Sequence, residues 1–301
     1  MNHKFIKKEG IAQSFLARYL LTEQPGNRLK TIDALAKESD LSVGLMQGAL
    51  KSLEQAGAIG IERRGRNGSF IVTADQKVLL KHANIGNVVC AMPLPYTRIY
   101  EGLASGLKAQ FADISFYFAH MRGSDVRIEC LLNGLYDLAV TSRLAAESYV
   151  KRQQVQVALS LGEHSYTEQH QLIYRRGERD TIRKVGIDSA SADQKIMTAA
   201  FFAGQPITLV EISYHECLKQ IVSGDIDAAI WNVGHDDDLT PLGLVTESLC
   251  GDECFTSASE AVILTRPNDV QMQQLLHTLL DRHRLLQHQQ HVVAGDIRPV
   301  Y

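Results

Sequence analysis

The sequence contains little of what marks membrane, disulfide-bonded or secreted proteins. Its five cysteines are odd in number and form no C-x-x-C pair, a usage typical of reduced thiols in a cytosolic protein. No apolar run approaches the roughly 18 residues that a membrane-spanning helix needs. The first ten residues, MNHKFIKKEG, are basic but lead into no apolar stretch, so no secretory signal is predicted. We therefore expect a soluble, cytoplasmic protein without a membrane partner.

Sequence motifs of catalytic sites are also missing. The stretch GLASG at 102–106 has its serine one place too late for a G-x-S-x-G nucleophile elbow, and neither a P-loop nor a G-x-G-x-x-G motif follows an expected strand. His215 and Cys217 lie two apart and so do not share a helix face. His288 and His291 are more typical of a solvated helix end than of a metal site. The sequence thus predicts no catalytic residues, no metal and no cofactor.

The sequence does contain an ordinary globular composition with an uneven distribution of charge. Apolar residues make up 45% and charged residues 22% of 301 residues, a length that favours two domains. Residues 1–80 hold 12 Lys and Arg against 8 Asp and Glu, a net charge of +4. Because the whole chain has a net charge of −3, the remaining residues carry −7. This asymmetry suggests that only the N-terminal part meets a polyanion.

Residues 1–75 have the pattern of a helix-turn-helix domain. An amphipathic helix is expected over 10–21. Thr31 is a good N-cap for a second, short helix, and Ser42 leads a third helix that Gly57 would end as a C′ glycine. Two short helices joined by about four residues are typical of a helix-turn-helix.

A basic hairpin is expected directly after the third helix. Asn67 and Gly68 are the pair preferred in a two-residue type I′ turn. With that turn, Ile61, Phe70 and Val72 would pack inward. Guanidinium groups on such a narrow hairpin can lie along a DNA backbone or enter a minor groove. The outer face and the tip would carry Arg63, Arg64 and Arg66.

The stretch 41–72 resembles the second half of a GntR-type winged helix-turn-helix. It runs from a serine-led recognition helix, through Ala-Leu-x-x-Leu-x-x-x-Gly at 49–57, to a glycine-rich basic wing that ends in Phe-x-Val at 70–72. One departure is that exposed positions of the recognition helix carry Gly44 and Gln47, where the family usually has an arginine. The resemblance implies binding to double-stranded DNA. The residues expected to contact it are Thr31, Ser42, Gln47, Lys51, Arg63, Arg64, Arg66 and Asn67.

Residues 88–301 alternate strands and helices, after an expected linker at 76–87. The order β-α-β-α-β over 87–142 predicts parallel strands covered by helices, and a second such run begins at Lys184. LLNGLYDLAV at 131–140 aligns with IVSGDIDAAI at 221–230, each giving a helix end, a glycine, an aspartate and a buried strand. This repeat predicts an α/β domain of two similar lobes with a cleft between them.

Polar residues gather at the expected carboxyl ends of these strands, where ligands bind in such folds. Serine hydroxyls and N–H groups at helix N-termini favour a carboxylate or a phosphate. Arg122 or Arg143 could hold that group in a bidentate pair. The residues expected to contact the ligand are Pro95, Tyr96, Arg122, Ser124, Ser142, Arg143, Ser189, Ser191, Tyr214 and Trp231.

This body resembles the type II periplasmic-binding-protein fold, which is reused as the effector domain of LysR-type regulators. Over its whole length the chain is similar to the YhfZ family, in which a GntR-like head precedes such a domain. The resemblance implies a transcriptional regulator and leaves the ligand unnamed.

Three hypotheses about function fit these patterns. The first is a ligand-responsive regulator, a homodimer that binds double-stranded DNA and a small anionic metabolite. The second is an enzyme that acts on a small acid in the cleft, with the N-terminal domain as an interaction module. A strongly shifted pKa in the cleft would favour it. The third is a regulator that binds DNA but has lost its effector.

Overall fold

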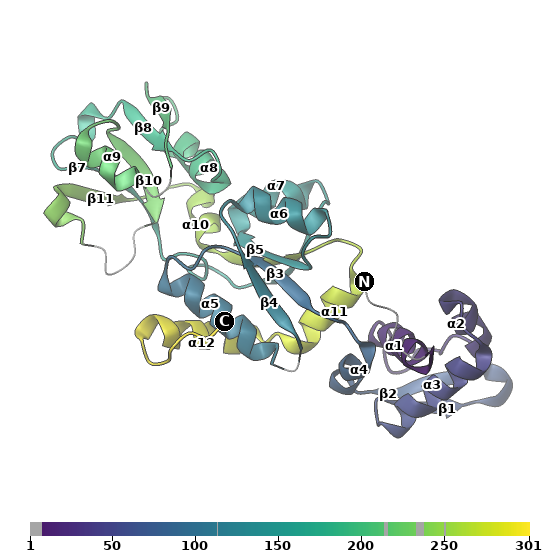
Figure 1. Ribbon diagram of the computed structural model, residues 1–301. Coiled ribbons are helices and arrows are strands. Elements are labelled where there is room, and N and C mark those ends of the chain that lie inside the picture. The colour runs from purple at the N-terminus through teal and green to yellow at the C-terminus, as the bar shows by residue number, and fades with distance from the viewer. Residues whose placement is uncertain (1–7, 113, 214–215, 233–237, 250) are drawn as a thin grey trace. The chain divides into compact units, whose positions relative to one another are not determined.

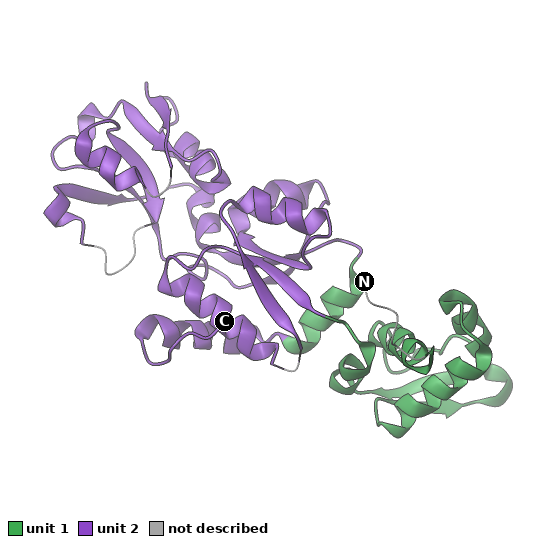
Figure 2. Cartoon of the chain, in the orientation of Figure 1, with its two compact units in different colours: residues 1–86, 269–279 green, residues 87–268, 280–301 purple. Residues whose placement is uncertain are grey.

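The computed structural model describes residues 8–112, 114–213, 216–232, 238–249 and 251–301. The chain divides into two compact units, residues 1–86 with 269–279 and residues 87–268 with 280–301 (Figure 2). The first unit therefore includes a short second segment from the C-terminal part of the sequence. A helix with both the length and the apolar content of a membrane span is absent from the described ranges.

The first unit is a helical domain with a two-stranded hairpin (Figure 1). Its elements are α1 (Lys8–Leu21), α2 (Ile32–Ser39), α3 (Val43–Gln55), β1 (Ile59–Arg63), β2 (Ser69–Ala74), α4 (Gln76–Ala83) and α11 (Val270–Leu279). Helix α1 packs on both α3 and α4, and it buries Leu16 and Leu20 completely. Helix α11 contacts α1 and α4 and buries Leu275 and Leu276, which explains why residues 269–279 belong to this unit.

The predicted helix ends of the helix-turn-helix are confirmed. The Thr31 hydroxyl accepts a hydrogen bond from the backbone N–H of Ala34, and the Ser42 hydroxyl accepts one from that of Leu45. Both side chains thereby satisfy N–H groups that a helix leaves free in its first turn. Gly57 follows the end of α3 with φ +71, a conformation that glycine adopts at little cost.

The segment expected to be a linker, 76–87, is largely helical. Asp75 accepts a hydrogen bond from the backbone N–H of Val78 and so caps α4. Leu79 and Leu80 of this helix are buried in the first unit. Arg18 of α1 also donates to the carbonyl oxygen of Ala83 at 2.8 Å. The helical spacing of its apolar residues lets α4 pack with the N-terminal unit, whose first segment runs to residue 86.

The hairpin turn and the inward face of the hairpin were predicted wrongly. Arg63 pairs with Ser69, so five residues separate the strands, and a short 3-10 turn (Gly65–Asn67) fills the loop. A type I′ turn needs positive φ at both central residues, which Gly68 has at +88 and Asn67 does not. An irregularity in register after Gly60 leaves Ile71 buried and Val72 52% exposed.

The second unit consists of two lobes, each with its own five-stranded sheet among the described residues (Figure 1). The first lobe contains β3 (Val88–Met92), α5 (Arg98–Gln110), β4 (Phe116–His120), α6 (Ser124–Leu132), β5 (Leu138–Ser142), α7 (Arg143–Lys151), β6 (Gln156–Ser160), β12 (Ala261–Thr265) and α12 (Arg282–Ala294). The second contains β7 (His170–Arg175), β8 (Lys184–Ile187), α8 (Ala192–Phe201), β9 (Thr208–Glu211), α9 (Cys217–Ser223), β10 (Ala228–Asn232) and β11 (Leu244–Ser248). The chain passes between the lobes after β6 and again after β11, where α10 (Glu253–Ser259) lies.

Both sheets have the same strand order. It is β4-β3-β5-β12-β6 in the first lobe and β9-β8-β10-β7-β11 in the second. In each sheet, three parallel strands are followed by an antiparallel strand that the chain reaches from the other lobe. Gly134 and Gly224 end the aligned helices α6 and α9 with φ +69 and +84. The unit therefore has the bilobal, type II periplasmic-binding-protein-like α/β fold, and the internal repeat is confirmed.

Each copy of the repeat contains the same arrangement of an aspartate and an arginine. Asp137 exchanges two hydrogen bonds with the backbone of Val89, and Asp227 does the same with that of Lys184. Arg266 and Arg175 each donate from Nη1 to two carbonyl oxygens at the helix-to-strand turn of their own lobe. The acceptors are Leu131 and Tyr136 in the first lobe and the aligned Ile221 and Ile226 in the second.

Candidate functional site

A hollow of about 540 Å³, lined by charged, polar and apolar side chains, lies beside α3 in the first unit. Four residues expected to contact DNA line it, and they come from three different elements. Arg28 and Lys30, which precede α2, line it as well and were not singled out from the sequence. The four expected residues are Thr31 before α2, Gln47 and Lys51 on α3, and Arg63 at the end of β1.

The exposed face of α3 is unusually open. Gly44 and Gly48 have no atom within 4 Å of the place that a Cβ would occupy. Ser42, Gln47 and Lys51 are exposed beside them. A helix face of this kind lets a backbone or a groove edge come close, with Gln47 able to form paired hydrogen bonds to a base.

Two of the three arginines of the hairpin are already paired with carboxylates. Arg63 Nη2 lies 2.7 Å from Glu54 Oε2, and Arg64 Nη2 lies 2.6 Å from Glu62 Oε2. The hydrogen bond from Arg64 lowers the pKa of the Glu62 carboxyl. Arg66, like Asn67 beside it, is exposed, and it makes no ion pair with any residue that the structure describes. The hairpin is therefore less basic in effect than its sequence suggests.

The second unit has a cleft between its lobes. Part of this space, about 120 Å³, is lined by residues at the ends of β3, β4, β8 and β10 and at the N-termini of α5, α6 and α8. Of the ligand-binding residues expected from the sequence, Tyr96, Arg122, Ser124 and Ser191 line this space. Pro95 does not, although its neighbours Pro93 and Leu94 do. Tyr214 lies outside the described residues.

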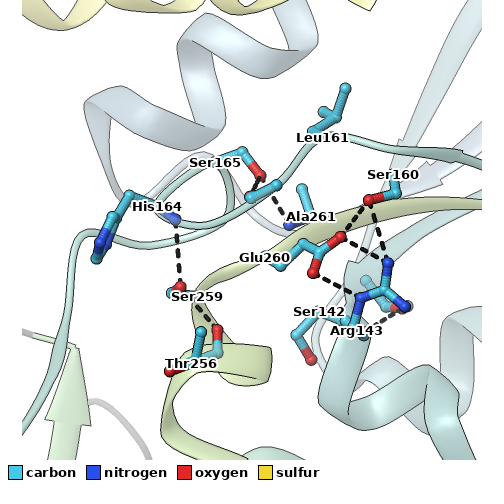
Figure 3. A network of polar contacts seen from close by, with 12 residues as sticks. Ser142, Arg143, Ser160, Leu161, His164, Ser165, Thr256, Ser259, Glu260 and Ala261 are labelled. Atoms are coloured by element: carbon cyan, nitrogen blue, oxygen red, sulfur yellow. Dashed lines mark hydrogen bonds and ion pairs between the residues drawn. The ribbon is translucent and has the colours of Figure 1, made fainter. Parts of the chain in front are cut away.

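Arg143 has a different role from the expected one. Its guanidinium forms a bidentate pair with Glu260, at 2.5 and 2.8 Å, and also donates to the Ser160 hydroxyl (Figure 3). Nearby, Ala261 N–H donates to the Ser165 hydroxyl at 2.9 Å. These contacts join the two segments that connect the lobes, so Arg143 stabilises the connection, and it is not among the residues that line the space described above.

Three further expected residues are not among those that line this space. Ser142 is buried, Ser189 donates to exposed Glu211 at 2.6 Å, and the partly buried Trp231 packs against a core cluster of the second lobe. Because side chains alternate along a strand, it is the next residue, Asn232, that lines the cleft.

Oppositely charged side chains meet in the cleft. Arg122, after β4 in the first lobe, lies 2.6 Å from Asp188, after β8 in the second. Arg127 is buried and donates to two carbonyl oxygens and to the Tyr166 hydroxyl. Position 127 is one turn into α6, so only burial distinguishes it from a surface arginine, and sequence reasoning missed it.

Two titratable groups in the cleft have strongly shifted pKa values. Burial raises the pKa of the Asp193 carboxyl to about 6, although hydrogen bonding to Ser142 and the charge of Arg127 oppose the shift. Burial lowers the pKa of His170 to about 4, which keeps the imidazole neutral at pH 7. Its buried Nδ1 has no hydrogen-bond partner among the described residues. Within these ranges, no group of three metal-binding side chains is found.

Two family models match successive parts of the chain. A helix-turn-helix domain family matches residues 24–71, and the family described as YhfZ C-terminal domain matches residues 75–301. The YhfZ protein of Escherichia coli (strain K12) is 60% identical over 301 residues, which is the whole of both chains. The crystal structure of YhfZ from Shigella flexneri, 59% identical, covers 75% of this chain and 97% of that one with a TM-score of 0.68. The chain therefore belongs to the YhfZ family.

Proposed function

We propose that this protein is a ligand-responsive transcriptional regulator. In this proposal the first unit binds double-stranded DNA, and the cleft of the second unit binds a small metabolite that carries an anionic group. The protein would act in the cytoplasm. It would be a homodimer, because winged-helix domains usually read paired half-sites. It would use no cofactor.

The observation that carries the DNA-binding part is the hollow beside α3. Thr31, Gln47, Lys51 and Arg63 meet there, although they are spread over 33 positions of sequence. The neighbouring Arg28 adds a guanidinium to this face. A helix with an open face, flanked by cations, is suited to phosphate contacts on both sides of a base-reading side chain. In this proposal Gln47, which lines the hollow, is that side chain.

The ligand-binding part is supported by the composition of the cleft. Its arginines, hydroxyls and helix N-termini all favour an anionic group. A ligand that binds one arrangement of the lobes better than another would shift the population of that arrangement, and with it the affinity for DNA.

A binding selection from genomic fragments, at physiological salt, tests the proposal. We expect the purified chain to recover one or a few short sites with two-fold symmetry. Gln47→Ala should relax the sequence preference, and Lys51→Ala should weaken binding to all sites. Lys77→Ala serves as the control, because Lys77 is an exposed lysine on α4 outside the hollow. Recovery of no specific site by the parent protein would contradict the proposal.

An enzyme acting on a small acid is the second candidate, favoured by the shifted pKa values of Asp193 and His170. Asp193 would serve as an acid or base near pH 6. One of its oxygens, however, accepts a hydrogen bond from Ser142, which also caps α7. Consumption of a small acid by the purified chain, lost in Asp193→Asn, would establish this candidate in place of a purely regulatory role.

A further inference from the structure

We propose that the ligand of the cleft is a small zwitterion, a molecule that carries both a carboxylate and a protonated amine. This inference rests on the proposed function, since it takes the cleft to be the effector site. It goes further by naming the chemical class of the effector, in contrast to a simple anion.

The first argument is the balance of charge in the cleft. Its charged lining residues in the described ranges are Arg122, Arg127, Asp188 and Asp193, two of each sign. His170 adds no charge at neutral pH. A site built for a simple anion would be expected to have an excess of positive charge. This one offers equal numbers of partners for a negative and for a positive group.

The second argument is the pair between Arg122 and Asp188. Among the residues that the structure describes, only Nη2 of Arg122 has a hydrogen-bond partner, so another edge of its guanidinium can face a ligand. The Asp188 carboxylate accepts from Arg122 and from the backbone N–H of Ala190, and its side chain is only 11% exposed. A simple anion that drew Arg122 away would leave this carboxylate without its cation, at a considerable cost. A zwitterion would replace both partners, with its carboxylate on Arg122 and its ammonium on Asp188.

The carboxylate of the zwitterion would have a second binding partner in the first lobe, besides Arg122. Helix α6 begins at the cleft after Gly123, which has no side chain to accept from the N–H groups of the first turn. These N–H groups and Ser124 lie on the same side of the cleft as Arg122. A carboxylate there would meet a guanidinium and an uncapped helix N-terminus together.

The ammonium end has acceptors in the second lobe. Besides Asp188, the cleft offers the Asp193 carboxylate and Nδ1 of neutral His170, which has no partner among the described residues and accepts when the ring proton is on Nε2. Burial is the main effect that disfavours the ionised form of Asp193, and a neighbouring ammonium would oppose it. The two lobes thus attract opposite ends of one molecule, which would hold them together.

The volume of the cleft space limits the size of the zwitterion that it could hold. An engineered cavity of about 150 Å³ holds one benzene molecule. The 120 Å³ measured here, open to the rest of the cleft, therefore suits a small amino acid rather than a nucleotide.

Thermal unfolding of the full chain with three matched sets of probes tests the inference. The first set is glycine, β-alanine, L-alanine, L-serine and L-proline. The second is acetate, propionate and lactate, which lack the amine, and the third is ethylamine and ethanolamine, which lack the carboxylate. We expect at least one amino acid to raise the melting temperature, with no comparable effect of any probe in the other two sets.

Variants then test the assigned partners. Asp188→Asn and Arg122→Gln should each weaken binding of that amino acid by roughly ten- to a hundredfold, as expected for loss of a charged hydrogen bond. Ser223→Ala, a change at an exposed serine at the end of α9 whose hydroxyl contacts Gln220 and Asp225, should leave it unchanged. Circular dichroism of each variant checks that it is folded. If one of the two charge variants does not fold, the other still tests the assigned site.

The outcomes separate this inference from the proposed function. Equal stabilisation by an acid and by its aminated counterpart would overturn the zwitterion but leave an anionic effector. Stabilisation by none of the probes would also overturn it, while the selection from genomic fragments would still decide whether the chain binds specific DNA. Unchanged affinity in both Asp188→Asn and Arg122→Gln would overturn the assigned site.

Discussion

The Ser142 hydroxyl donates to Asp193 Oδ1 over 2.7 Å, and this bond joins the two lobes in the interior of the molecule. The same hydroxyl oxygen accepts a hydrogen bond from the backbone N–H of Ala145 and so caps α7. Both side chains are buried. One serine therefore supports a helix in its own lobe and a carboxyl group in the other.

Ser142→Ala should lower the free energy of unfolding by about 1–3 kcal/mol, because it removes a helix cap and leaves a buried carboxyl with an unmet hydrogen bond. Urea unfolding followed by circular dichroism would measure this. Ser148→Ala, an exposed position on the same helix, is the matched control and should change stability by much less. Equal effects of the two substitutions would contradict the assigned role of Ser142.

The stability of the protein should respond to the protonation of two cleft residues in opposite directions. Folded Asp193 has a pKa of about 6 against an ordinary 3.8, so between these values the folded state holds a proton that the unfolded state has lost. Asp193 therefore lowers stability as pH rises through this interval. Folded His170 has a pKa of about 4 against 6.5, so there the unfolded state holds the extra proton, and His170 raises stability as pH rises.

Asp193→Asn removes one of these opposing effects. Its unfolding free energy, measured in urea from about pH 4 to about pH 6.5, should therefore rise more steeply with pH than that of the parent protein. His170→Gln should give a shallower rise or a fall. Parallel pH profiles in the three proteins would mean that neither group has the shifted pKa described here.

Glu54 should limit the affinity of the first unit for DNA. Its carboxylate lies 2.7 Å from the Arg63 guanidinium in the hollow beside α3 and would repel a phosphate placed there. Glu54→Gln should therefore bind DNA of any sequence more tightly, with a steeper dependence on salt because one more cation is free to contact phosphate. Fluorescence anisotropy at several salt concentrations would measure this.

In the same assay Arg66→Ala should weaken binding and reduce the salt slope by about one.

The paired arginine contacts of the repeat should matter equally in the two lobes. Arg175→Ala and Arg266→Ala each leave carbonyl oxygens without a charged donor, and each should lower the free energy of unfolding by about 1–3 kcal/mol. Arg284→Ala is the control, because that side chain is 80% exposed. A large effect at only one of the two sites would show that the lobes do not share this stabilising contact.

Local chemistry and repetition made much of the fold predictable. The hydroxyls of Thr31 and Ser42 accept hydrogen bonds from N–H groups only three residues away, so both helix starts could be predicted from the sequence. The glycine and aspartate of each repeat lie at fixed offsets, which predicted two similar lobes. The hairpin was harder, because a loop of five residues and one irregular pair of strands decide together which face is buried.

The cleft was only partly predictable because distant residues compete for each side chain. Arg122 and Arg143 both follow an expected strand end in the sequence. The structure pairs Arg143 with Glu260, which is 117 positions away in the sequence. Arg127 and Asp193 acquire their properties from burial, which no local pattern reports. Residues at several of the expected strand ends do line the cleft space. Which side chains remain available to a ligand depends on the opposing segments.

Helix α11 makes the N-terminal unit non-modular. It follows β12 in the sequence yet fills the core of the first unit with Leu275 and Leu276, against α1 and α4. A fragment ending at residue 86 would lack this helix and expose the apolar surface that it covers. The helix-turn-helix unit is therefore not a simple N-terminal segment that could be exchanged between proteins, and fusions that transfer it should keep residues 269–279 together with residues 1–86.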